Sequence, residues 1–191
     1  MKLIPTDLPE VVIVEPTVFG DDRGWFIESF NAQRFEDGLL QLGLPAPGRF
    51  VQDNHSCSKA GVLRGLHLQR APHAQGKLVR VVQGAVFDVA VDVRPGSPTL
   101  GRWVGVELTA ANRRQLWIPP GFAHGFLALT DDTHFLYKTT DYYAKDQEMA
   151  IHWQDPEIGI AWPLAGREPL VAPKDVAAPC LRDALVTLTS A

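Results

Sequence analysis

The sequence has few of the features that mark membrane, disulfide-stapled or nucleic-acid-binding proteins. It holds only two cysteines, Cys57 and Cys180, in 191 residues, so we expect free thiols and a cytoplasmic location rather than a disulfide framework. No segment approaches the roughly 18 apolar residues that span a bilayer, and the start, Met1 to Asp7, has no apolar signal core. The net charge of -4, without a basic block, argues against nucleic acid as a partner. Neither a membrane nor a nucleic acid is therefore expected.

Apolar residues and turn formers, by contrast, are plentiful. Hydrophobic types make up 46% of the chain, which argues against disorder and fits a single domain over residues 1–191. The 16 glycines and 15 prolines recur along the whole length instead of gathering in one linker. Such spacing is typical of many short strands joined by turns.

The hydrophobic pattern predicts a protein made mainly of strands. From Phe87 to Arg94 apolar and polar residues alternate, with turn residues on both sides, as in a strand with two unlike faces. Further strands are predicted at Val11–Val14, Val18–Phe19, Trp25–Phe30, Val104–Leu108, Leu116–Ile118, Phe126–Leu129 and Phe135–Thr140. These closely spaced strands indicate an all-β fold, an antiparallel sandwich or jelly roll.

Two short helices are expected at the periphery. Asn31 is a good N-cap for a helix whose apolar face would be Phe35, Leu39 and Leu42, although Gly38 weakens it by about 1 kcal/mol. The tail from residue 175 to residue 188 is predicted to form a turn and a second short helix.

Polar residues inside apolar strands are the candidates for chemistry, and His67 is the first of them. An imidazole titrates near neutral pH and can act as a base, but a single histidine on a strand is more often a hydrogen-bonded core residue. Strict alternation puts His67, Gly65 and Gln69 on one face of their strand. Arg64 would then point the other way unless Gly65 forms a bulge, which glycine often permits.

Other strands carry groups of the same kind. The Tyr137 phenol could donate a proton, although an ordinary amphipathic tyrosine would look the same. Gln52 and Asn54 face the same way and need polar partners, which a sugar, a base or neighbouring loops could supply. Arg64 and Lys77 are flanked by apolar strand residues, which makes them better candidates than Arg23 for binding a phosphate or carboxylate.

A metal site is the main rival explanation for a β-protein with six histidines. No His-x-His pair and no His-Glu-x-x-His motif occurs, so local spacing does not support one, and no metal is expected. A Gly-rich phosphate loop and a nucleophile elbow are also missing from the sequence.

Several ordered segments together resemble one enzyme family, the dTDP-4-dehydrorhamnose 3,5-epimerases. The resemblance runs from about Val11 to Leu185. It includes Phe19–Gly24, Phe50–Ser56, Leu63–His67, Ala74–Arg80, Phe87–Asp92, Trp117–Phe126 and Tyr137–Lys138. It implies a cupin-type antiparallel jelly-roll barrel with a few short peripheral helices, a homodimer, and no metal or organic cofactor. One departure is Leu68, which stands where the family usually has an aromatic residue; its side chain is expected to point away from His67.

The resemblance also implies roles for individual residues. His67 would be the base, oriented by Asp175, and Tyr137 the acid on the opposite face of the sugar. The substrate would be a dTDP-linked 4-keto-6-deoxyhexose, contacted by Arg23, Glu28, Gln52, Asn54, Arg64, Lys77, His124, Tyr143, Glu148 and Lys174.

The implied activity is the conversion of dTDP-4-dehydro-6-deoxy-D-glucose to dTDP-4-dehydro-L-rhamnose for dTDP-L-rhamnose biosynthesis. Inversion beside a ketone passes through an enolate, whose oxygen either Lys77 or His124 could stabilise. Three alternatives remain open: a mono-epimerase or keto-isomerase on a related dTDP-sugar, a sugar-nucleotide binder without catalysis, and a metal-dependent oxygenase of the same fold.

Overall fold

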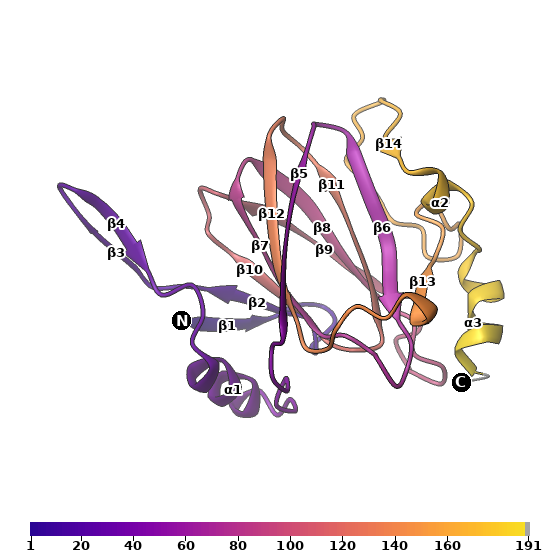
Figure 1. Ribbon diagram of the computed structural model, residues 1–191, viewed down its shortest axis with the longest axis horizontal. Coiled ribbons are helices and arrows are strands. Elements are labelled where there is room, and N and C mark those ends of the chain that lie inside the picture. The colour runs from indigo at the N-terminus through magenta and orange to yellow at the C-terminus, as the bar shows by residue number, and fades with distance from the viewer. Residues whose placement is uncertain (190–191) are drawn as a thin grey trace.

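The computed structural model describes residues 1–189, which form short strands and a few helices (Figure 1). The strands are β1 (Lys2–Pro5), β2 (Val12–Glu15), β3 (Val18–Asp21), β4 (Gly24–Ile27), β5 (Gln52–Ser58), β6 (Val62–Gln69), β7 (Lys77–Gln83), β8 (Ala85–Asp92), β9 (Trp103–Thr109), β10 (Gln115–Ile118), β11 (Phe122–Ala128), β12 (Thr133–Thr139), β13 (Glu148–Ala150) and β14 (Leu170–Val171). The helices are α1 (Ala32–Gln41), α2 (Pro173–Val176) and α3 (Leu181–Thr189), with one 3-10 turn at Lys145–Gln147.

Two sheets face each other and form the body of the molecule (Figure 1). One has the strand order β1-β2-β10-β7-β12-β5, and the other β13-β6-β11-β8-β9 with β14 added beside β6. Their ladders are antiparallel except for the β14–β6 pair. The predicted all-β antiparallel jelly roll is confirmed. Strand β1 was not predicted, and the strand expected from Trp25 to Phe30 ends at Ile27.

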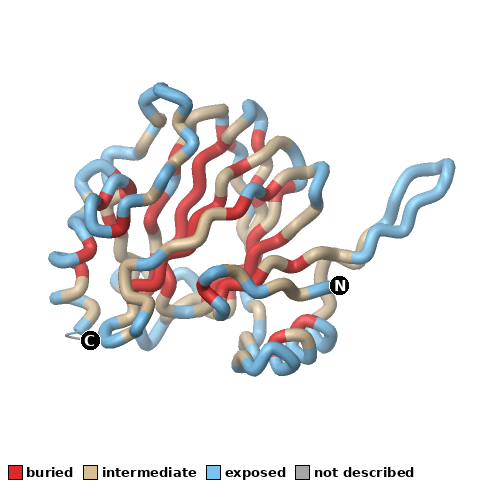
Figure 2. The backbone as a smooth tube through the Cα atoms, turned by 180° about the vertical axis from the view of Figure 1, so that it is seen from behind, coloured by how far each residue is buried: buried red, intermediate tan, exposed pale blue. Residues whose placement is uncertain are grey.

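The space between the sheets is filled by aliphatic and aromatic side chains, and the buried segments lie along the central strands (Figure 2). Phe126 of β11 and Phe135 of β12 stack across the sandwich with ring centroids 4.3 Å apart. Such burial is the main favourable term in folding, and here it holds the two sheets at a fixed distance. The strands are therefore a rigid support for any polar side chain that points inward.

Helix α1 covers one end of the first sheet, as its apolar face predicts. Asn31 caps it by accepting a hydrogen bond from the Arg34 amide at 3.1 Å. Phe35 and Leu39 are buried against the sheet, whereas Leu42 follows the helix and is 36% exposed. The predicted cap is confirmed, and the predicted apolar face is one residue too long.

Strands β3 and β4 form a separate two-stranded hairpin that projects from the body (Figure 1) and is exposed along its length (Figure 2). Phe19, Trp25 and Phe26 on this hairpin are 60%, 57% and 67% exposed. An isolated hairpin is at best marginally stable in water, and clustered exposed aromatic residues mark contact surfaces.

A bulge in β6 changes which side chains face the interior of the sandwich. His124 of β11 pairs with His67, but Phe126 pairs with Arg64, so β6 carries one extra residue there. Gly65 lies inside the bulge with φ of +126°. The conditional expectation from the sequence is therefore met, and Arg64 and His67 can reach the same cavity.

We predict that Gly65→Ala lowers the free energy of unfolding by about 2–4 kcal/mol, because it combines backbone strain with a steric clash. A Cβ at this position would lie 2.5 Å from the Cα of Gly125 and 2.8 Å from the carbonyl oxygen of His124. Denaturant unfolding of the purified variant measures the loss.

Gly24→Ala is the matched control for this experiment. Gly24 has nearly the same φ, +132°, but a Cβ added there would have no heavy atom within 4 Å beyond its chain neighbours. Gly24→Ala should lower the free energy of unfolding by about 1–2 kcal/mol, because it adds backbone strain without the steric clash. Equal losses in the two variants would contradict the close contact between β6 and β11.

Candidate active site

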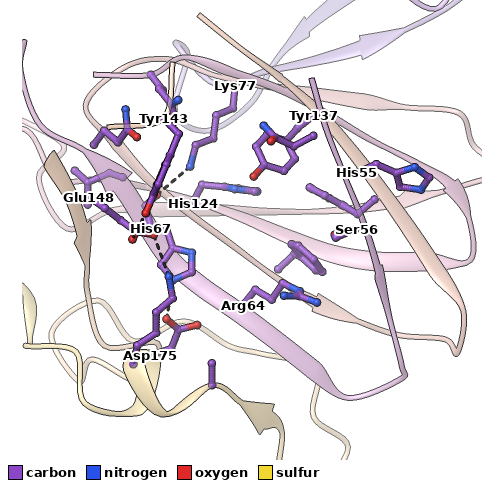
Figure 3. Close-up of a pocket in the computed structure, with 18 residues that line it drawn as sticks. His55, Ser56, Arg64, His67, Lys77, His124, Tyr137, Tyr143, Glu148 and Asp175 are labelled. Atoms are coloured by element: carbon purple, nitrogen blue, oxygen red, sulfur yellow. Dashed lines mark hydrogen bonds and ion pairs between the residues drawn. The ribbon is translucent and has the colours of Figure 1, made fainter. Parts of the chain in front are cut away.

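A pocket of about 410 Å³ lies at one end of the sandwich and takes its walls from both sheets (Figure 3). All the predicted site residues line it except Arg23, Glu28 and Gln52. Phe126 and Phe135 belong both to this lining and to the core. The polar groups therefore stand on a packed apolar support, as in most small-molecule sites.

His67 and Asp175 form a hydrogen-bonded pair on one wall (Figure 3). The Nε2 of His67 lies 2.7 Å from Oδ1 of Asp175, and the Gly65 amide donates to the other carboxylate oxygen at 3.3 Å. Burial of Asp175 on helix α2 opposes its ionisation, but these hydrogen bonds outweigh burial, so its pKa lies below the usual range. The ionised carboxylate fixes the orientation of the imidazole.

Tyr137 enters the pocket from β12, in the sheet opposite that of His67 (Figure 3). Burial raises the pKa of its phenol, and the nearby Arg64 guanidinium offsets this only in part. The hydroxyl therefore keeps its proton at neutral pH. A protonated phenol can act as an acid, and this one lies across the cavity from the imidazole.

Lys77 and His124 line the pocket, and Asp88 lies fully buried beside His124. His124 Nε2 lies 3.0 Å and 3.2 Å from the two carboxylate oxygens of Asp88, and Lys77 Nζ donates to the His67 carbonyl at 3.2 Å. Burial lowers the pKa of Lys77 to about 8, against the attraction of Asp88 and Glu148. Burial likewise lowers the pKa of His124, which is neutral at pH 7. The group thus presents one cation to the cavity.

Three more predicted residues of the pocket lining, Tyr143, Glu148 and Lys174, are joined by hydrogen bonds at its mouth, and Figure 3 labels the first two. Tyr143 donates its hydroxyl proton to Glu148 at 3.0 Å, and Lys174 donates to the other oxygen of that carboxylate at 3.0 Å. Burial opposes the charge on Glu148, but Lys174 and Tyr143 outweigh it and hold its pKa below the usual range. The cluster links β13, the segment before it, and helix α2.

Arg64 and Asn54 complete the lining on the side of β5 and β6. The Arg64 Nε donates to Ser58 at 3.3 Å, a bond that uses neither of its terminal NH2 groups. Gln52 does not line the pocket; it donates to Asn54 at 3.0 Å and accepts from the Tyr143 amide at 3.1 Å. Gln52 therefore holds two lining residues in place.

The structure does not bring Arg23 and Glu28 to the pocket of their own chain. Arg23 lies on the turn of the projecting β3–β4 hairpin, where its guanidinium pairs with Asp21 at 2.5 Å. Glu28 follows the hairpin and pairs with Arg34 at 3.0 Å. A contact between either residue and a ligand in this pocket would need the hairpin of another copy.

Two buried polar residues beside the predicted site were not identified from the sequence. Asp88 is fully buried beside His124. The signal available in the sequence was an acidic residue on the same strand face as the apolar Ala90. Gln69 is 5% exposed at the end of β6, and the face that it shares with His67 did not by itself indicate a role.

Leu68 packs in an apolar cluster with Leu66, Ile151 and Leu181, in agreement with the expected orientation.

Within residues 1–189, no three His, Cys, Asp or Glu side chains are grouped so that they could share a metal ion. In the same part of the chain, no helix has the length and apolar character needed to cross a membrane.

Comparison with known proteins gives consistent results. A sequence model described as dTDP-4-dehydrorhamnose 3,5-epimerase matches residues 5–183. The protein of that name from Salmonella typhimurium is 56% identical over 190 residues, covering 98% of this chain and 99% of that protein.

Two solved structures resemble the whole chain. A dTDP-6-deoxy-D-glucose-3,5-epimerase from Legionella pneumophila, in complex with dTDP-4-keto-L-rhamnose, superposes with a TM-score of 0.88 at 52% identity and covers 96% of both chains. A 3'-monoepimerase from Streptomyces bikiniensis, in complex with dTDP-quinovose, has a TM-score of 0.86 at 35% identity and covers 98% of this chain and 91% of its own.

We predict that the Lys77 ammonium titrates near pH 8 instead of at the usual 10.5, because burial disfavours its charge. The cation should be present below pH 8 and lost as the pH rises through that value. NMR of protein labelled at the lysine Cε and Nζ atoms measures this directly, and Lys77→Arg identifies the signal by removing it. A titration near pH 10.5 would contradict the proposed burial of charge.

Proposed function

This chain belongs to the dTDP-4-dehydrorhamnose 3,5-epimerase family, and we propose that it inverts C3 and C5 of dTDP-4-dehydro-6-deoxy-D-glucose to give dTDP-4-dehydro-L-rhamnose. The observation that carries this proposal is a His67–Asp175 pair and a protonated Tyr137 on facing walls of one pocket. The step belongs to dTDP-L-rhamnose biosynthesis, and we place the enzyme in the cytoplasm, where its exposed Cys57 and Cys180 would stay reduced.

In the proposed reaction His67 removes the proton from the carbon beside the C4 ketone. The electron pair of the broken C–H bond moves toward the ketone and forms an enolate, and the proton resides on the imidazole, stabilised by Asp175. Tyr137 then protonates the same carbon from the opposite face, and the configuration inverts. Proton transfer of this kind requires no oxidant, metal or organic cofactor.

Lys77 is the group we assign to the enolate oxygen. Both Lys77 and His124 line the cavity, but His124 is neutral and uses its Nε2 on Asp88. Lys77 carries a positive charge below pH 8 and keeps donors free beyond its bond to the His67 carbonyl. A buried cation is worth most where negative charge develops during reaction, and removing such a group typically costs about 10²–10³ in rate.

The nucleotide part of the substrate is proposed to lie toward the pocket mouth. The Arg64 guanidinium and the Lys174 ammonium can bind the diphosphate, since both side chains line the pocket. Asn54 and Tyr143 offer an amide and an aromatic ring to the sugar and the base. Glu148 holds Tyr143 and Lys174 in position through its two oxygens.

We further propose that the enzyme is a homodimer in which each β3–β4 hairpin reaches the pocket of the other copy. The exposed Phe19, Trp25 and Phe26 give the hairpin an apolar surface to bury. Arg23 and Glu28 belong to the expected substrate contacts but lie outside the pocket of their own chain. Exchange of the hairpin between two copies would bury the aromatic residues and also bring Arg23 and Glu28 to a pocket.

The runner-up function is epimerisation at a single carbon. A 3'-monoepimerase shares the fold at 35% identity, and the same base and acid could serve it. The 3,5-epimerase from Salmonella typhimurium is more similar, at 56% identity, which favours action at both carbons.

We predict that the protein, incubated with dTDP-4-dehydro-6-deoxy-D-glucose in D₂O, introduces deuterium with inversion at both C3 and C5. NMR of the product distinguishes the two carbons. Exchange at only one carbon would favour the mono-epimerase, and no exchange despite binding would refute the assigned activity.

Removal of the base provides the mutational arm of this test. His67→Asn should lower the exchange rate by about 10²–10⁴, because it removes a general base, while binding of dTDP is retained. His152→Asn is the matched control, since His152 lies outside the pocket lining and should exchange as fast as the unaltered protein.

The hairpin proposal predicts complementation between two impaired variants. Arg23→Ala should be impaired because the partner copy lacks its cation, and His67→Asn because it lacks the base. Co-expression should restore about a quarter of the native activity, since half of the dimers are mixed and each of these has one complete site. Activity equal to the average of the two parents would show that Arg23 does not act across the dimer.

A further inference from the structure

Gln69 is a buried polar residue to which the mechanism above gives no task. It is the last residue of β6, two positions after His67, and pairs in register with Glu148 of β13. Its side chain borders the pocket and is 5% exposed. A buried amide must have all its hydrogen-bonding groups satisfied, so its partners show what it supports.

All the identified partners of this amide belong to the backbone of two loops. Nε2 donates to the carbonyl of His73 at 2.7 Å and to the carbonyl of Tyr142 at 3.1 Å, and Oε1 accepts from the Ala144 amide at 2.9 Å. These bonds use both N–H groups and the oxygen of the amide. Gln69 therefore has no N–H group left for a ligand, and only the second lone pair of its oxygen remains.

The Tyr142 and Ala144 contacts lie on either side of Tyr143. This residue stands at the pocket mouth, with its hydroxyl on Glu148. The segment 140–144 has no helix or strand of its own, so side-chain bonds must hold its backbone. Gln75 adds one bond to the same segment, donating to the Asp141 carbonyl at 2.8 Å.

We propose that Gln69 is a positioning residue that presents Tyr143 to the substrate by clamping the backbone on both sides of it. The inference rests on the proposed function, because Tyr143 contacts the dTDP-sugar there. The base and the positioned tyrosine are thereby attached to the same strand, His67 directly and Tyr143 through Gln69. A preformed contact binds more tightly than one that must be ordered on binding.

A double-mutant cycle with Gln69→Leu and Tyr143→Ala tests this inference. Gln69→Leu should raise KM and the Kd for dTDP about tenfold and leave kcat within about twofold, because an ordering cost is added while the reacting groups stay in place. Tyr143→Ala should raise both by a similar factor. The double variant should be no worse than Tyr143→Ala alone.

Two results would overturn the inference. Effects that multiply in the double variant would mean that Gln69 acts independently of Tyr143. An unchanged KM and Kd in Tyr143→Ala would mean that there is no contact for Gln69 to position. The Kd for dTDP is measured without turnover, so the double-mutant cycle gives a result even if the protein does not catalyse the assigned epimerisation. Failure of the proposed function can therefore be distinguished from failure of this inference.

Further variants separate positioning from loss of folding. Gln75→Leu removes only the single bond to Asp141 and should raise KM in the same direction by about threefold, with an unchanged melting temperature. Gln41→Leu, on the exposed face of α1, makes the same substitution far from the pocket and should leave KM and kcat unchanged. A rise in KM that follows melting temperature across the three single glutamine variants would contradict positioning.

Discussion

The active site depends on one close contact, between the backbones of β6 and β11 at Gly65 and Gly125. A Cβ added at either glycine would come within 2.5 Å or 2.7 Å, respectively, of the opposite strand's backbone, so neither position has room for a side chain. The contact accommodates a bulge that shifts the register by one residue between His67 and Arg64. Without that shift, alternation would send His67 and Arg64 to opposite faces of the sheet. The same bulge directs the Gly65 amide to Asp175, so it also orients the hydrogen-bond partner of His67.

Around this contact the pocket buries ionisable groups at a cost to stability. Asp88, Asp175 and Lys77 are each less than a tenth exposed, and such charges are tolerated only when they are paired and hydrogen-bonded. Each has its partner: His124 for Asp88, His67 for Asp175, and the His67 carbonyl for Lys77. The packed apolar core beneath them supplies the stability that this arrangement uses. In the proposed reaction this cost would have a function, because burial strengthens the attraction between Lys77 and the enolate oxygen.

Much of this could be predicted from the sequence, and the failures have identifiable causes. The alternation near Phe87 gave a strand, and the Asn31 cap gave a helix start, because both signals are local. The His67, Tyr137 and Asp175 group followed from family resemblance, since their distances along the chain carry no geometry. Strict alternation could not determine the side chain direction of Arg64, which depends on a pairing between distant strands. The roles of Asp88 and Gln69 depend on partners contributed by other strands and loops, which no local pattern reveals. Arg23 and Glu28 do not line the pocket of their own chain, and the sequence of one chain does not show contacts between copies.

The central claim is that His67 and Tyr137 act from opposite faces of the sugar, one removing a proton and the other returning it. The most direct test is Tyr137→Phe with dTDP-4-dehydro-6-deoxy-D-glucose in D₂O, with deuterium content and configuration read by NMR on the same sample. The account predicts that deuterium still enters, through His67, but that the labelled carbon keeps its original configuration. Inversion at the native rate would contradict the account, as would a loss of exchange as complete as that caused by removing the base.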